Sequence, residues 1–353
     1  MNNKDLLFWG ILAMLLMTAC SSKEKNEYIP TQPIVTAVTP VIQFEISGGY
    51  QKYVYAPSAI EDNGIRYLAL CKNRDQGVVV DYVYFYKGTP NSLGKYVWDE
   101  GKEILGPSSS GWDSEHTCDP DIREFKLKYK GETYNWIMTY LGCDQRDNNH
   151  NQIGLAFSKN IDGPYIKYDK NPLIPTHAGF NAWGVGQSTS IVIDTTTIQL
   201  FYSSSPFDIM VRSVKLYDLE NVDIGTPQIV KNIFPNAYIA YSKKNIYGVY
   251  EKRVEINDGK PTGDFSCLMY KPLSAGLFSV TNDWTIIGQV GPANTKYPHN
   301  HNPGFLTDKK GYMLSDDEAV VYFTVGESGD NWLWSYQLYS ATFDLKTPNS
   351  SPN

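Results

Sequence analysis

The chain reads IGLAFSKNIDGPY at residues 153–165 and NPL at residues 171–173. The apolar run from Ile153 to Ser158 predicts a buried β-strand. The triplet Asp162-Gly163-Pro164 predicts the turn that ends it, because Gly and Pro favour the backbone angles of tight turns. This combination of an apolar strand and a turn rich in Gly, Pro, Asn or Asp recurs along the chain, and its recurrence decides the fold.

Five copies of a strand-rich unit can be laid out along the sequence. They begin at Ala56-Pro57, Asp119-Pro120, Gly186-Gln187, Ala237 and Asn302-Pro303. The turn Asp62-Asn63-Gly64 separates two strands of the first copy, Lys130-Gly131 does so in the second, and the fifth copy ends on a predicted strand over Leu333–Thr342.

Each copy holds about four strands in roughly 50 to 70 residues, which is typical of the blades of a propeller. We therefore predict an all-β, five-bladed β-propeller. The early strand Val41–Ile46 is expected to complete the last blade and close the ring, which would remove an exposed edge. A β-sandwich, or a pair of smaller β domains, is the alternative.

Composition agrees with a β protein of acidic surface. The chain has 26 Tyr, 14 Phe and 8 Trp, residue types that favour strands. Its net charge is -7 and no basic run occurs, which argues against nucleic acid as a partner.

The first residues have the pattern of an export signal. A polar and basic start leads into the apolar run Leu6–Met17, which is short for a membrane span, and then into Thr18-Ala19-Cys20. This resembles the lipobox of bacterial lipoprotein precursors, so Cys20 is predicted to carry a lipid anchor; an ordinary secretory signal is the alternative. The expected organisation is a lipoprotein signal peptide at 1–19, a flexible tether at 20–32, the propeller at 33–347 and a disordered tail at 348–353.

Four further cysteines follow, namely Cys71, Cys118, Cys143 and Cys267. None are spaced as CxxC pairs, so no zinc or other metal site is predicted. An oxidising compartment permits a disulfide, such as Cys118 with Cys143, and the pairing is left open. The stretch Asp144–Asn151 is rich in oxygen ligands and could hold calcium, although it lacks the EF-hand pattern and a solvated loop is the simpler interpretation.

The repeats resemble the five-bladed propeller glycosidases, the superfamily that contains glycoside hydrolase family 43 and its relatives. The resemblance rests on the strand with its Gly163-Pro164 turn and Asn171-Pro172, and on Tyr55-Ala56-Pro57-Ser58 and Cys118-Asp119-Pro120-Asp121-Ile122 as starts of innermost strands. It implies an axial pocket in which two Asp and one Glu act as base, pKa modulator and acid.

The usual trio does not carry over to this chain. Its first-blade position reads Tyr55-Ala56-Pro57, and the third and fourth blades offer Gln187 and Tyr238. The carboxylates instead cluster ahead of the second blade, with Asp113 and Asp144 as outlying members. Asp119 or Asp121 is the candidate base and Glu115 or His116 the candidate acid, against the alternative of turn chemistry and a solvated loop.

Sugar binding is predicted for a second set of residues. His299 and His301 alternate along an extended segment and so point to the same side, where they could reach a sugar or a metal. Flat aromatic rings near the strand starts could stack on a pyranose, although most such rings pack in the core. The candidate set is Tyr55, Trp112, His116, Trp183, Gln187, His299 and His301.

The sequence thus predicts a glycosidase that acts on oligosaccharides or polysaccharide side chains at the bacterial envelope, lipid-anchored and on the outer membrane. Its partners would be carbohydrate and lipid, with no cofactor required. The alternative is a non-catalytic glycan-binding surface lipoprotein, which the missing trio favours.

Overall fold

The computed structural model describes residues 38–205, 208–217, 219–220, 222–233, 236–255, 261–279, 283–329 and 332–346. They belong to one unit that spans Pro33–Asn353. The predicted signal peptide, the lipidation residue Cys20, the tether and the tail at 348–353 lie outside the described residues. Among those described, no helix is long and apolar enough to span a membrane.

The regular structure of the described residues is mostly antiparallel β-strand, and we call the groups of strands blades one to five in chain order. Blade one holds β2 (Val54–Asp62), β3 (Ile65–Asn73), β4 (Asp81–Pro90), β5 (Tyr96–Trp98) and β6 (Lys102–Leu105). Blade two holds β7 (His116–Tyr129), β8 (Glu132–Cys143), β9 (Gln152–Ser158) and β10 (Ile166–Lys167). Blade three holds β11 (Val185–Val192), β12 (Thr197–Ser204), β13 (Asp208–Lys215), β14 (Asp223–Ile224) and β15 (Gln228–Val230).

Blade four holds β16 (Tyr238–Tyr241), β17 (Asn245–Glu255), β18 (Pro261–Pro272) and β19 (Thr285–Val290). Blade five holds β20 (His299–Thr307), β21 (Glu318–Gly326), β22 (Gln337–Asp344) and β1 (Val41–Ser47). The short helices are η1 (Leu273–Ala275), α1 (Pro292–Thr295) and η2 (Trp332–Ser335). The strand predicted over Leu333–Thr342 therefore starts later, at Gln337, because residues 332–335 form a 3-10 turn.

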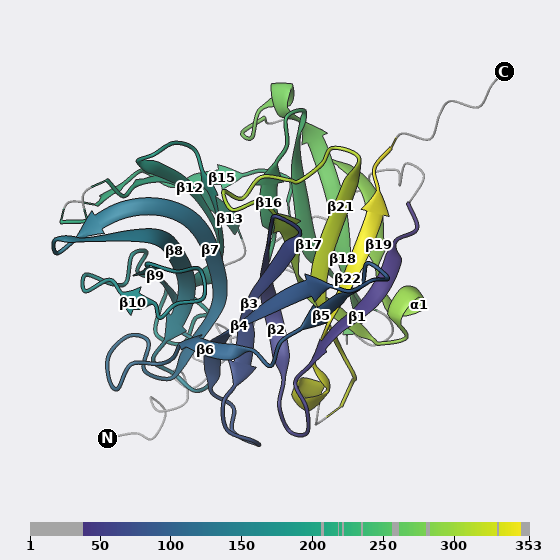
Figure 1. The fold of residues 1–353 in the computed structure, drawn as a ribbon, viewed down its shortest axis with the longest axis horizontal. Helices are drawn as coiled ribbons and strands as arrows, with labels where there is room; N and C mark the ends of the chain where they lie inside the picture. Colours follow the sequence, from purple (N-terminus) through teal and green to yellow (C-terminus); the bar gives the residue numbers. More distant parts are fainter. Residues whose placement is uncertain are drawn as a thin grey trace, which may run out of the picture. The chain divides into compact units, whose positions relative to one another are not determined.

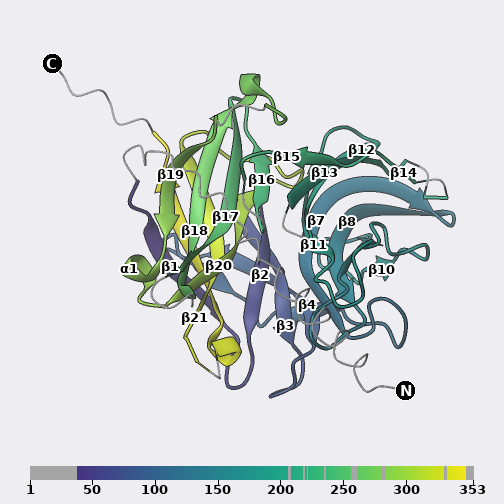
Figure 2. The same ribbon diagram turned by 180° about the vertical axis from the view of Figure 1, so that it is seen from behind.

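The first and last strands meet in blade five, as the sequence predicted. β1 pairs antiparallel with β22, with Val41 opposite Thr342. Blades one and five join further through a short parallel contact between β2 and β20, where Ala59 lies opposite Leu306. Figures 1 and 2 show the long, curved strands β7 and β8 on one side of β2 and β3, and β17, β18 and β21 on the other.

A buried apolar cluster fills the space between each blade and the next. Five clusters join blades one and two, two and three, three and four, four and five, and five and one. Neighbouring residues of one strand serve different clusters, because strand side chains alternate between faces. Phe305 packs toward blade four and Leu306 toward blade one. This ring of blade-to-blade cores is the packing of a β-propeller.

Turn chemistry sets the register of the strands. Asn63 and Gly64 have φ of 51° and 74°, the left-handed pair that a two-residue hairpin turn requires. Lys130 and Gly131 repeat this geometry between β7 and β8, with φ of 50° and 82°.

Candidate functional site

In every blade a residue in the left-handed backbone region lies near the start of the innermost strand. In β2, β7, β11 and β20 the strand register shifts around this residue, which is the mark of a β-bulge. In blade four it lies just ahead of β16. The five residues and their φ angles are Ala56 (52°), Asp119 (44°), Gln187 (50°), Asn236 (59°) and Asn302 (47°).

This conformation costs about 1 to 2 kcal/mol for most residues, and Asn and Asp tolerate it better than others. Ala56 and Gln187 have no such tolerance, yet they adopt it at the same place in their blades. Backbone strain of this kind clusters at functional sites, where it aims side chains that ordinary strand geometry would direct elsewhere.

The five residues converge on one pocket of about 40 Å³, which we call the axial pocket. The residue that follows each of them also lines it, together with Tyr238; these followers are Pro57, Pro120, Ser188, Ala237 and Pro303. Typical ligand pockets measure about 300 to 1,000 Å³. This one therefore admits a small substituent rather than a whole sugar ring.

Asp119 is the one carboxylate among the described residues that line the axial pocket. Burial and the negative charge of nearby Asp81 raise its pKa to about 7, and a hydrogen bond from the backbone amide of Gln187 offsets part of that effect. Asp119 is thus divided between its neutral and ionised forms near neutral pH. A carboxyl group in this state can both donate and accept a proton.

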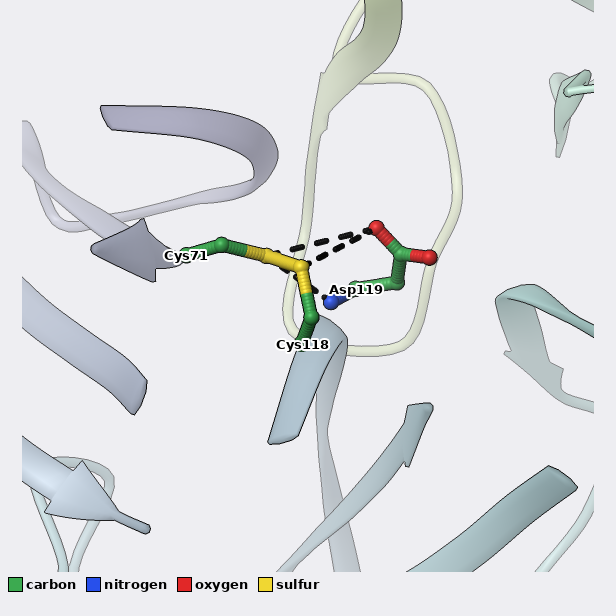
Figure 3. A group of neighbouring side chains, drawn as sticks. All are labelled: Cys71, Cys118 and Asp119. Carbon is green, nitrogen blue, oxygen red and sulfur yellow. Dashed lines mark hydrogen bonds between the residues drawn. A yellow bond between two sulfur atoms is a disulfide. The ribbon is translucent and has the colours of Figure 1, made fainter. Parts of the chain in front are cut away.

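A disulfide lies directly beside Asp119. Cys71 of β3 and Cys118 of β7 are bonded, with a Cα–Cα distance of 5.1 Å, and so join blades one and two. Figure 3 shows both sulfur atoms next to the Asp119 carboxylate, and the Asp119 amide donates to Cys71 Sγ over 3.0 Å. These three residues are also the one group with metal-ligand spacing in the described part of the chain, but a disulfide offers no thiolate to a metal.

The pairing of Cys118 with Cys143, one option from the sequence, does not occur. Cys143 is a free, buried thiol. The register of β7 and β8 explains this, because it places Leu141 opposite Cys118 and puts His116 opposite Cys143. Cys118 and Cys143 therefore do not lie opposite each other on these adjacent strands.

Asp121, the second candidate base, lies in a buried ion pair. One of its oxygens is 2.6 Å from Arg123 Nη2, and the other accepts hydrogen bonds from the amide and hydroxyl of Ser190 at 2.8 and 2.6 Å. The Tyr238 hydroxyl also donates to it, at 3.1 Å. These contacts join blades two, three and four and give Asp121 a structural position.

His116 and Tyr55 meet at Asp81, a residue that no pattern in the sequence singles out. His116 Nδ1 lies 2.9 Å from the Asp81 carboxylate, and both side chains are buried. Burial by itself would lower the pKa of His116, but the hydrogen bond and charge of Asp81 outweigh it and raise that pKa. Tyr53 donates to the same carboxylate at 2.8 Å, and Tyr55 also hydrogen-bonds to it.

Three other candidates take different positions. Glu115 forms a surface pair with Arg146 at 3.3 Å. Trp112 packs on Tyr140 inside the core between blades one and two. Trp183 is partly buried against the small apolar cluster around the disulfide, close to the axial pocket.

His299 and His301 lie side by side, with ring centroids 6.2 Å apart. His299 Nδ1 is 2.8 Å from Asp264, while the His301 ring contacts the Tyr336 ring at 4.6 Å. Tyr336 in turn contacts Tyr55 at 5.9 Å. A band of rings therefore runs from blade five to blade one beside the axial pocket.

The loop at 144–151, rich in oxygen ligands, holds a side-chain hydrogen bond of its own. Asp144 lies 3.0 Å from Nδ1 of His150. The Asn151 side-chain amide donates to the backbone oxygen of Asn148 at 2.8 Å. Some of the polar side chains of this loop therefore form hydrogen bonds to other residues of the same loop.

Gln187 adds an open hydrogen-bonding position to the axial pocket. Its side-chain oxygen is buried and finds no donor among the described residues. Buried polar atoms are seldom left unpaired in folded proteins, so such an atom at a pocket calls for a ligand hydroxyl or a water.

No protein-family model matches the sequence, and none of the curated proteins does. Solved structures do match. A structure of BT0996 in an RGII complex is 13% identical with a TM-score of 0.57, covering 87% of this protein and 91% of the other. A family 117 glycoside hydrolase of Zobellia galactanivorans is 14% identical, with a TM-score of 0.56 and coverage of 88% and 91%. An α-L-arabinofuranosidase of Podospora anserina, solved with cellotriose, is 11% identical, with a TM-score of 0.54 and coverage of 88% and 96%. The protein therefore has the β-propeller fold that these glycoside hydrolases share.

Proposed function

We propose that this protein is a glycosidase that engages a carbohydrate over the axial pocket, with Asp119 as the proton donor. The observation that carries the proposal is the position of Asp119. Asp119 has a left-handed backbone conformation and lines the pocket on which all five blades converge, and its pKa is raised to about 7. General acids work best when their pKa lies near the working pH.

In this reaction the protonated Asp119 gives its proton to the glycosidic oxygen as the bond from that oxygen to the anomeric carbon breaks. Water supplies the hydroxyl that the anomeric carbon gains, and the proton released by the water restores Asp119. The unpaired oxygen of Gln187 and the amides of Asn236 and Asn302 are placed to hold sugar hydroxyls.

A second candidate function is carbohydrate binding without turnover. The observation that favours it is the lining itself, because the four positions equivalent to Asp119 hold Ala56, Gln187, Asn236 and Asn302. The described residues of this lining include no second carboxylate or histidine for activating water. Under this function Asp119 accepts sugar hydroxyls and transfers no proton.

We further propose that the protein works at the bacterial envelope through a lipid on Cys20, as the lipobox-like sequence suggests. Anchored there, it would meet extracellular or periplasmic glycans. The named activities of proteins with this fold include α-L-arabinofuranosidase and β-xylosidase, which recommends arabinose- and xylose-containing glycans among the first substrates to try.

The test is product release from plant and algal glycans and from aryl pentosides, measured together with binding. Asp119→Asn is compared with the wild type, and Lys128→Ala, an exposed lysine on the far part of β7, is the matched control. Turnover that is lost in Asp119→Asn and kept in Lys128→Ala supports the glycosidase. Saturable binding without turnover, weakened in Asp119→Asn, supports the second function. If Asp119→Asn changed neither binding nor turnover, the axial pocket would be ruled out as the carbohydrate site.

A further inference from the structure

A second, larger groove lies at the junction of blades five and one. Its volume is about 430 Å³, within the range of about 300 to 1,000 Å³ typical of ligand sites. Its walls come from the loop between β1 and β2 and from η2 and the start of β22. The residues that matter here are Tyr50, Gln51, Lys52, Trp334, Tyr336 and Gln337.

The aromatic walls of this groove differ in how firmly they are held. The Trp334 ring packs on Tyr53 at 5.8 Å, and Tyr53 is fully buried, with its hydroxyl bonded to Asp81 at 2.8 Å. Tyr50 instead is 79% exposed. One fixed and one exposed ring offer flat faces of the kind that pyranose rings stack on.

The groove also has a positive charge. Lys52 has no carboxylate within ion-pair distance among the described residues, although the whole chain carries a net charge of -7. A second lysine, Lys72, is close enough that the charge of Lys52 adds to burial in lowering its pKa. An anion that enters the groove would therefore meet a cation that no described carboxylate already occupies.

We propose that this groove is a binding site for an acidic oligosaccharide, with a uronate carboxylate on Lys52 and a pyranose face on Trp334 or Tyr50. The amides of Gln51 and Gln337 are positioned for the ring hydroxyls. The site does not depend on proton transfer by Asp119. Ring contacts do connect the two, because the groove residue Tyr336 touches Tyr55, whose neighbour Ala56 lines the axial pocket.

The experiment is calorimetric titration of the wild-type protein with trigalacturonate, which carries one carboxylate per pyranose. The matched probe is the same trisaccharide with its carboxylates methyl-esterified, which removes each charge and adds only a methyl group. The variants are Lys52→Gln, Tyr50→Ala and Trp334→Ala, with Lys128→Ala as the control lysine. Tyr50 is so exposed that its removal should leave the fold intact, which keeps the test informative if Trp334→Ala is unstable.

We expect trigalacturonate to bind at least tenfold more tightly than its ester, and this preference to disappear in Lys52→Gln and shrink with added salt. Tyr50→Ala should weaken both probes several-fold. Lys128→Ala and Asp119→Asn should change neither, which separates this site from the axial one. Equal affinity for acid and ester, no binding of either at millimolar concentration, or loss of binding in Asp119→Asn alone would each overturn the proposal.

Discussion

The backbone amide of Asp119 donates to Sγ of Cys71 over 3.0 Å, so the acidic residue of the axial pocket is tied to the disulfide between blades one and two. The position of that carboxylate thus depends on a covalent bond to a different blade. The same disulfide therefore holds blades one and two together and helps to fix the position of Asp119 in the axial pocket.

As the proposed proton donor, Asp119 with its raised pKa should give turnover a defined pH dependence. With the pKa at about 7, the acid form is nearly complete at pH 5 and is lost above pH 7, so turnover should fall about tenfold per pH unit on the alkaline side. Asp119→Asn should lower kcat by roughly 10² to 10⁴. Initial rates between pH 5 and 9 provide the measurement, and an alkaline limb that stays flat in the wild type would contradict the role of proton donor.

The disulfide should contribute to stability, because it closes a loop with a sequence separation of 47 residues. The double variant Cys71→Ser, Cys118→Ser should lose about 2 to 4 kcal/mol of unfolding free energy. Urea unfolding with and without a thiol reductant measures this. Reductant should lower the midpoint of the wild type and leave the double variant unchanged; an unchanged wild type would show that the bond does not form or does not stabilise.

The buried pair of Asp121 and Arg123 should be costly to break. Arg123→Met leaves a charged Asp121 inside the protein, and we expect a loss of about 3 to 5 kcal/mol. The exposed pair of Lys102 and Asp162 serves as the control, since Lys102→Ala should cost no more than about 1 kcal/mol. Chemical denaturation of both variants measures the two losses of unfolding free energy. Similar losses would mean that the buried pair stabilises the fold no more than the exposed pair does.

The pair of His116 and Asp81 should make stability depend on pH. Because the pKa of His116 is higher in the folded state, the pair stabilises the protein fully below the unfolded value of about 6.5. That contribution is lost as pH rises through the folded pKa. Thermal unfolding between pH 5 and 9 should show a larger loss in the wild type and in His150→Asn, whose more exposed ring pairs with Asp144, than in His116→Asn. The raised pKa of Asp119 leaves a smaller loss below pH 7 in all three proteins. A parallel pH dependence in His116→Asn would assign the effect to other groups.

The fold could be predicted because its signals are local. Asn63-Gly64 and Lys130-Gly131 specify hairpin turns by themselves, and the apolar strands between such turns repeat. The pairing of β1 with β22 could also be anticipated, since a ring of blades leaves an exposed edge unless its first and last strands meet. The start of β22 could not, because nothing local distinguishes the 3-10 turn at residues 332–335 from a strand.

The site was harder to predict because its chemistry depends on neighbours distant in sequence. Asp119 and Gln187 could be identified from their place at strand starts, and both line the axial pocket. Asp121 has the same local sequence signals, yet Arg123 and residues of other blades enclose it. Asp81 has no such signal, because its influence on His116 and Asp119 arises only when blades one and two pack together.

Closure of blade five by β1 and β22 has a consequence for how the protein is made. The Ser340 hydroxyl donates to Glu45 at 2.6 Å across a separation of 295 residues. Strand β1 leaves the ribosome long before its partner β22. Until β22 follows, the first strand has no sheet to join, so the native ring can form only after almost every blade has been synthesised. A chain stopped before residue 337 would keep two unmatched strand edges and remain exposed to proteases and to aggregation.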